Sequence, residues 1–237
     1  MSDFIIYIKQ RFSLGLFSLL TIFLLLFSKS KLIFEWEDVS HFFILFFFLF
    51  IIRLFDDLQN SVTDSHKKNR VYTGRKARKK LNIALGLLLI IFLYFVYNYN
   101  TELFKYVIAF FLINWLLYLL FFPFRNVKNY LPLLKYPMIS IILLEGFNWA
   151  SMALFLAMIV FEILEDTEFP IDRKYSYPIG IIAISLLIPT LHLYYFILLL
   201  CILSLSIFLI TRKTKWTPYQ FLLLFLITRL ITISYEI

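Results

Sequence analysis

Apolar runs close to the length that crosses a lipid bilayer recur along almost the whole sequence. An α-helix needs ~20 mainly apolar residues to span the hydrocarbon core. The runs cover Phe12–Phe27, His41–Phe55, Leu81–Tyr97, Leu103–Phe122, Leu131–Ile163, Pro178–Ile210 and Pro218–Ile233. Of the 237 residues 62% are hydrophobic, well above the share in a soluble domain. The sequence therefore predicts an all-α polytopic membrane protein with one transmembrane domain over residues 1–237.

Two of these runs, Leu131–Ile163 and Pro178–Ile210, are too long to be single spans. A helix of either length would measure roughly 50 Å, against a hydrocarbon core of about 30 Å. Each run also contains a plausible interruption. The interrupting residues are Glu145, Gly146 and Asn148 in the first run and Pro189, Thr190 and His192 in the second. Splitting both runs predicts about nine transmembrane helices.

The distribution of basic residues supports nine spans with the N-terminus in the cytoplasm. Cytoplasmic loops of membrane proteins are enriched in Lys and Arg. With nine spans, the basic loop His66–Lys80 and the other basic loops all fall on the cytoplasmic side. Of the 23 Lys and Arg residues, those left outside are Lys29, Lys31, Lys105 and Arg229. We therefore expect a multi-pass protein, of the bacterial inner-membrane type, with the loops after the second and sixth helices both cytoplasmic.

The net charge of +8 also reflects the basic loops that are predicted to be cytoplasmic. A basic excess in a membrane protein reflects its cytoplasmic loops and its contact with anionic lipid headgroups. We therefore expect the lipid bilayer, and no nucleic acid, as the partner of this charge. The single cysteine, Cys201, excludes an intrachain disulfide and a cysteine-based metal cluster.

An acidic cluster follows Arg53 at the cytoplasmic end of the second predicted helix. Asp57, Asn60 and Asp64 are spaced three and four residues apart, so they share one helical face, and Asp56 lies close to it. Carboxylate and amide oxygens are ligands that suit Mg²⁺. The following basic run, which includes Arg70, could bind phosphate oxygens. A helix end that simply becomes polar as it leaves the membrane is the other reading, but ionisable groups at this depth are candidates for function.

A second acidic cluster ends the sixth predicted helix. Glu162 and Asp166 are four residues apart on one face, and Asp172 and Lys174 follow in the loop. A solvated loop explains this cluster equally well when it is taken alone. Its significance comes from the predicted topology, which puts it on the same membrane face as Asp57.

The first cluster, Asp56-Asp57-x-x-Asn60-x-x-x-Asp64, resembles the first aspartate-rich motif of the UbiA superfamily of intramembrane prenyltransferases, with Asn60 in place of the central aspartate. The second cluster is similar to a degenerate form of that family's second motif. Nine helices with motifs after helices 2 and 6 also match the family. The resemblance thus implies one UbiA-like bundle around a central cavity, over nearly the whole chain.

This resemblance implies a Mg²⁺-dependent transferase that moves a polyprenyl group from its diphosphate to a lipophilic, usually aromatic, acceptor. Catalytic roles would fall to Asp57, Asp64 and Asp166. Metal ligands would be Asp56, Asp57, Asn60, Asp64, Glu162, Asp166 and Asp172. Substrate-binding candidates are Arg53, Arg70, Lys135, Lys174 and Asn114.

Two other functions remain open. A UbiA-type terpene cyclase would ionise the same kind of diphosphate without a separate acceptor. A transporter or a scaffold protein without activity would also explain a helical membrane protein in which Asn60 replaces an aspartate and the second motif has diverged.

Overall fold

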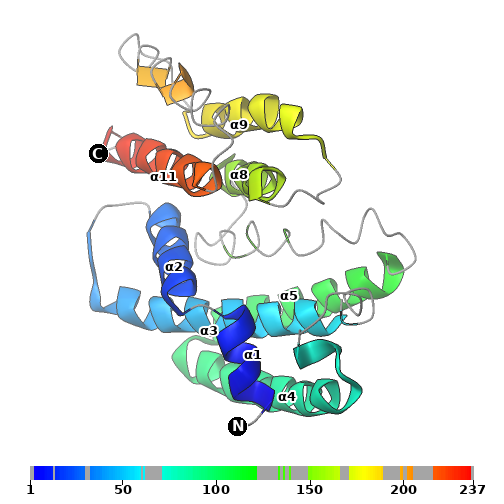
Figure 1. Ribbon diagram of the computed structural model, residues 1–237. Helices are drawn as coiled ribbons and strands as arrows, with labels where there is room; N and C mark the ends of the chain where they lie inside the picture. Colours follow the sequence, from blue (N-terminus) through cyan, green and yellow to red (C-terminus); the bar gives the residue numbers. More distant parts are fainter. Residues whose placement is uncertain are drawn as a thin grey trace. The chain divides into compact units, whose positions relative to one another are not determined.

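The structure is a computed structural model that describes residues 3–12, 14–29, 33–59, 61, 71–121, 133, 136, 139, 149–165, 171–188, 198–199, 202–204 and 216–235. Within these residues every regular element is a helix (Figure 1). The α-helices are α1 (Asp3–Arg11), α2 (Leu14–Ser28), α3 (Trp36–Gln59), α4 (Arg75–Tyr99), α5 (Thr101–Phe121), α8 (Trp149–Glu165), α9 (Ser176–Ser185) and α11 (Thr217–Tyr235). Two 3₁₀ turns, η2 (Val71–Thr73) and η4 (Arg173–Tyr175), precede α4 and α9.

Four of the helices, α3, α4, α5 and α11, are long and apolar enough to cross a membrane, and α1 with α2 would add a fifth span if that bent pair counts as one. Three of them, α3, α4 and α11, each contain a whole predicted apolar run, and α5 contains Leu103–Phe121 of the run Leu103–Phe122. On α4 the large side chains Ile90, Tyr94 and Phe95 are each about two-thirds exposed, a surface that water would not cover favourably and lipid would. The protein is therefore an all-α membrane protein. The predicted total of nine spans extends over residues outside those described and stays a prediction.

A helix ends within the second long apolar run, shortly before the predicted interruption at Pro189, Thr190 and His192, which lies outside the described residues. Helix α9 ends at Ser185, and the chain then tightens into i→i−3 hydrogen bonds from Leu187 to Ile184 (3.1 Å) and from Ile188 to Ser185 (3.2 Å). Pro189 follows directly and disfavours a helical conformation for Ile188. The predicted interruption of the first long run, at Glu145, Gly146 and Asn148, lies outside the described residues.

The chain divides into two compact units, which are described separately. The first comprises Met1–Leu25 and Phe34–Ala109, and the second comprises Leu26–Ile33 and Phe110–Ile237. The prediction of one domain over the whole chain is not tested by this division. The two predicted acidic clusters belong to different units.

The first unit has a core at the end of α3 that the sequence did not predict. Helix α1 packs against α4 and η2, while α3 packs against α4 and η2 as well (Figure 1). The seven residues buried in this core are Tyr7, Phe12, Phe50, Leu54, Leu58, Tyr72 and Leu81. Because aromatic side chains bury a large area, contacts such as the edge-to-face pair of Phe12 and Phe50 fix α1 on the end of α3.

In the second unit α8 packs against both α9 and α11 (Figure 1). Small residues, including Ala153 and Ala157 on α8 and Ala183 on α9, are fully buried, which allows helices to approach closely within a membrane. The start of α11 carries Tyr219, whose ring meets Phe161 of α8 edge to face at 5.5 Å. This packing positions the end of α8, where the second acidic cluster begins.

Candidate functional site

The C-terminal end of α3 carries the polar residues around which the candidate site is built. The apolar stretch of α3 continues to Leu54 and is followed by Phe55, Asp56 and Asp57 within the same helix. Arg53 and Asp57 are four residues apart, so their side chains lie on one face, with the Arg53 Nε 3.6 Å from the Asp57 Oδ2. Both aspartates are buried, each with 4% of its surface exposed.

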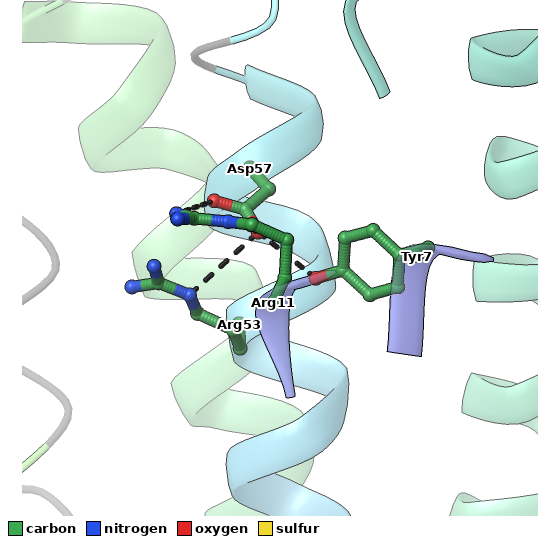
Figure 2. Close-up of polar contacts among 4 residues, drawn as sticks. All are labelled: Tyr7, Arg11, Arg53 and Asp57. Atoms are coloured by element: carbon green, nitrogen blue, oxygen red, sulfur yellow. Dashed lines mark hydrogen bonds and ion pairs between the residues drawn. The ribbon is translucent and has the colours of Figure 1, made fainter. Parts of the chain in front are cut away.

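The carboxylate of Asp57 is bound by two residues of α1. Arg11 donates from Nε to Oδ2 at 3.0 Å and from Nη2 to Oδ1 at 2.8 Å, which is a bidentate pair. The hydroxyl of Tyr7 donates to the same Oδ2 at 3.0 Å. Figure 2 shows both guanidinium groups on one side of Asp57 and the Tyr7 ring on the other. The buried charge of Asp57 is thus compensated by two positive groups and one phenol.

The spacing of residues on α1 explains why this short helix can bind Asp57. Tyr7 and Arg11 are four residues apart and so share the face that packs into the core. Behind them lies the fully buried Tyr72 of η2, whose ring meets Tyr7 edge to face and lies 5.6 Å from the Arg11 guanidinium carbon. The aromatic face attracts the cation and limits its movement.

Two polar contacts at the rim of the core also hold α1. The backbone N–H of Val71 donates to the Gln10 side chain at 3.1 Å, and the Lys80 ammonium lies 2.9 Å from an Asp3 oxygen. The Lys80 side chain is largely exposed, so this ion pair contributes little stability. The buried aromatic contacts and the Asp57 pair carry most of the attachment.

The remaining predicted residues of the first cluster are only partly described. Asp56 is buried and has polar contacts of its own. Asn60, Asp64 and Arg70 lie outside the described residues. Their predicted roles in metal and phosphate binding therefore stay predictions.

The second cluster is described at its two ends. Glu162 is half-buried at the end of α8, and it has contacts with other residues. Asp172 and Lys174 form an exposed ion pair at 3.2 Å in the turn before α9. Asp166, between these ends, lies outside the described residues, so the predicted face shared by Glu162 and Asp166 is not tested.

Two further substrate-binding candidates lie in the second unit. Asn114 is buried within α5, as a residue lining a polar site or a helix contact would be. Lys135 is outside the described residues. The predicted roles of Asn114 and Lys135 in substrate binding stay predictions.

The structure describes only part of the predicted Mg²⁺ site, namely Asp56 and Asp57 of the first cluster and Glu162 and Asp172 of the second. Within the described ranges no three His, Cys, Asp or Glu side chains are close enough to hold a metal ion. The oxygens of Asp57 point to Arg11, Tyr7 and Arg53 instead. Asp56, Asn60 and Asp64 keep the donor chemistry that suits Mg²⁺, whereas Asp57 is engaged with cations of the protein itself.

Of the predicted residues, the structure brings together Arg53 and Asp57, and it adds Tyr7 and Arg11 to them. The sequence contained one signal for this addition, the i,i+4 spacing of Tyr7 and Arg11 where an apolar segment becomes polar. That spacing does not reveal which carboxylate the helix binds.

Comparisons with protein-family models, with curated proteins and with solved structures found no match to this chain. The resemblance to the UbiA superfamily therefore rests on the motif and on the predicted topology alone.

Proposed function

We propose that the protein is a Mg²⁺-dependent intramembrane prenyltransferase of the UbiA type, which moves a polyprenyl group from its diphosphate to a lipophilic acceptor. The observation that carries this proposal is the cluster of Arg11, Arg53 and Asp57 at the end of a candidate membrane span. A guanidinium pair at that depth suits an anionic headgroup whose lipid tail enters the bilayer. The basic start of α4 adds positive charge to the same unit.

The proposed reaction separates charge, so the site must stabilise a departing anion. The bond between the allylic carbon and the diphosphate oxygen breaks, and the diphosphate leaves with the electron pair. The acceptor forms the new carbon bond and loses a proton. Preorganised cationic donors such as Arg11 and Arg53 stabilise the leaving diphosphate as its charge develops, while apolar walls exclude the water that would otherwise capture the allylic cation.

The proposed Mg²⁺ would be held by Asp56, Asn60 and Asp64 of the first cluster. Carboxylates of the second cluster would hold a second ion; these candidates are Glu162, Asp166 and Asp172. When bound, the ions would neutralise part of the charge on the diphosphate oxygens. Arg70, Lys135, Lys174 and Asn114 are retained as candidate substrate-binding residues.

The proposed architecture is nine spans in a UbiA-like bundle, in a bacterial inner membrane, with the N-terminus and both acidic clusters in the cytoplasm. The end of α9 at Ser185 supports a division of the second long apolar run, and nine spans require the first long run to be divided as well. A reporter fused after Lys215 tests the topology. A cytoplasmic reporter is expected, and a reporter outside the cell would mean that one long run crosses the membrane without a break.

A second candidate function, a scaffold protein without activity, is favoured by one observation. The Asp57 carboxylate already accepts hydrogen bonds from Arg11 and Tyr7. In a scaffold protein these bonds would have a purely structural role, which is to attach α1 to α3. The transferase would release diphosphate from a prenyl diphosphate, whereas the scaffold protein would not.

The deciding experiment incubates the purified full chain with Mg²⁺, geranylgeranyl diphosphate and a lipid extract that supplies acceptors. We expect diphosphate release together with a prenylated product, detected by mass spectrometry. A cyclised hydrocarbon formed without any acceptor would assign the chain to the terpene cyclases instead. Absence of diphosphate release with prenyl diphosphates of several lengths would favour the scaffold.

A further inference from the structure

The start of α4 carries exposed basic residues that have no acidic partner in the part of the chain that the structure describes. These residues are Arg75, Lys76 and Lys79. Two other basic residues of the same segment are engaged. Arg78 donates to the Ser61 hydroxyl at 3.3 Å, and the Lys80 ammonium lies 2.9 Å from an Asp3 oxygen. The first turn of α4 contains no acidic residue, so an uncompensated positive charge gathers at this end of the helix.

The two lysines among them continue into an exposed apolar stripe along α4 (Figure 1). Residues three or four positions apart share one face of a helix, and the residues spaced in this way, called here the α4 stripe, are Lys76, Lys79, Ile83, Leu87, Ile90 and Tyr94. The apolar members of the α4 stripe and its tyrosine are 57% to 67% exposed. The opposite face of the helix carries the buried Leu81 and Phe92. The α4 stripe is therefore the side of the helix that is turned away from the core.

The length of the α4 stripe corresponds to one leaflet of a bilayer. The eleven positions from Lys79 to Ile90 cover about 16 Å at a rise of 1.5 Å per residue, which is about half of a hydrocarbon core of ~30 Å. Tyr97 follows about 27 Å from Lys79, and its side chain is more than half exposed, as expected for an aromatic residue at the other membrane interface. The lysines thus lie at headgroup level when the apolar part lies among acyl chains.

We propose that the α4 stripe binds an anionic phospholipid, with the lipid phosphate at Lys76 and Lys79 and an acyl chain along the apolar residues below them. Basic residues next to a membrane helix attract anionic lipids. A lysine also suits this place because its apolar stem can lie against lipid while its ammonium reaches the headgroup. A soluble anion would use the lysines but not the apolar residues, so the α4 stripe as a whole fits a phosphate that carries acyl chains. This inference goes beyond the proposed function and does not depend on it.

The test uses the full chain in phosphatidylcholine nanodiscs that contain a small fraction of a photoactivatable phosphatidylglycerol. After illumination, mass spectrometry of peptides locates the cross-linked lipid. We expect labelling within Ile83–Ile90, and about tenfold less of it with a phosphatidylcholine that carries the same photoactivatable group. Equal labelling of α4 by the two lipids would overturn the proposal, because the lysines would then make no distinction between headgroups.

The matched variants remove two charges from different places. Lys76→Gln combined with Lys79→Gln should lower labelling of α4 by phosphatidylglycerol about tenfold, and glutamine keeps the helix because its helix propensity is close to that of lysine. The control combines Lys9→Gln with Lys105→Gln, at exposed lysines of α1 and α5. It should change the labelling about twofold or less. The same loss in both double variants would assign the effect to net charge and overturn the α4 stripe as a site.

A last arm separates the lipid from soluble anions. Glycerol phosphate or inorganic diphosphate is added in excess over the labelled lipid, at constant ionic strength so that screening does not change. We expect labelling of α4 to persist, because these anions have no acyl chain to place on the apolar residues. Displacement of the lipid by either anion would assign the lysines to a soluble ligand and contradict the proposal. Since no prenyl diphosphate is present, the result is separable from the test of prenyl transfer.

Discussion

Replacing Arg11 by methionine should destabilise the first unit. The substitution keeps the aliphatic length of the side chain but removes hydrogen bonds of 3.0 and 2.8 Å to Asp57. The Asp57 side chain, with 5% of its surface exposed, then keeps only Tyr7 and the more distant Arg53. Breaking a buried ion pair costs about 3–5 kcal/mol. Because Arg11 is 19% exposed and Arg53 stays nearby, we expect about 3 kcal/mol here.

The loss is best assigned to the pair by a double-mutant cycle with Asp57→Asn. Unfolding of the full chain in detergent can be followed by circular dichroism as a denaturant is added. We expect a coupling energy of about 2 kcal/mol between the two changes, whereas Lys9→Met on the exposed face of α1 should change stability by about 0.5 kcal/mol or less. Additive effects of Arg11→Met and Asp57→Asn would refute the pairing of α1 with α3.

Three further outcomes follow from the same contacts. Tyr7→Phe should lower the free energy of unfolding by about 1.5 kcal/mol, as expected for one hydrogen bond to a charged group, in the same denaturation assay; an unchanged value would contradict a bond at 3.0 Å. Asp64→Ala should abolish Mg²⁺-dependent release of diphosphate while the protein still folds, and release at the wild-type rate would remove Asp64 from the metal site. Asp57→Asn should keep its stimulation by Mg²⁺, and a loss of that stimulation alone would return Asp57 to the metal ligands.

The helices of the first half could be predicted from hydropathy because the apolar runs are separated by polar segments. The predicted run His41–Phe55 lies within α3, which extends further at both ends to Trp36 and Gln59. Hydropathy marks the apolar part of a helix, whereas the backbone hydrogen bonds continue into polar residues on either side. For that reason Asp57 could be placed on a helical face in advance.

The contacts of Asp57 could not be predicted in the same way. The acidic spacing suggested oxygens that converge on a cation, and the cations found at Asp57 are Arg11 and Arg53. Arg11 is separated from Asp57 by 46 positions, and the tertiary packing of residues such as Phe12, Tyr7 and Tyr72 brings α1 to this end of α3. Periodicity records which residues share a face of one helix, but it does not record which helices dock.

The central claim, that the chain transfers prenyl groups within the membrane, is tested most directly by mass spectrometry of lipid extracts from cells with and without the protein. We expect a prenylated lipid that depends on the wild-type chain and disappears when Asp64→Ala, or Arg11→Gln combined with Asp57→Asn, replaces it. Lipid profiles that do not differ between cells with and without the protein would contradict the claim.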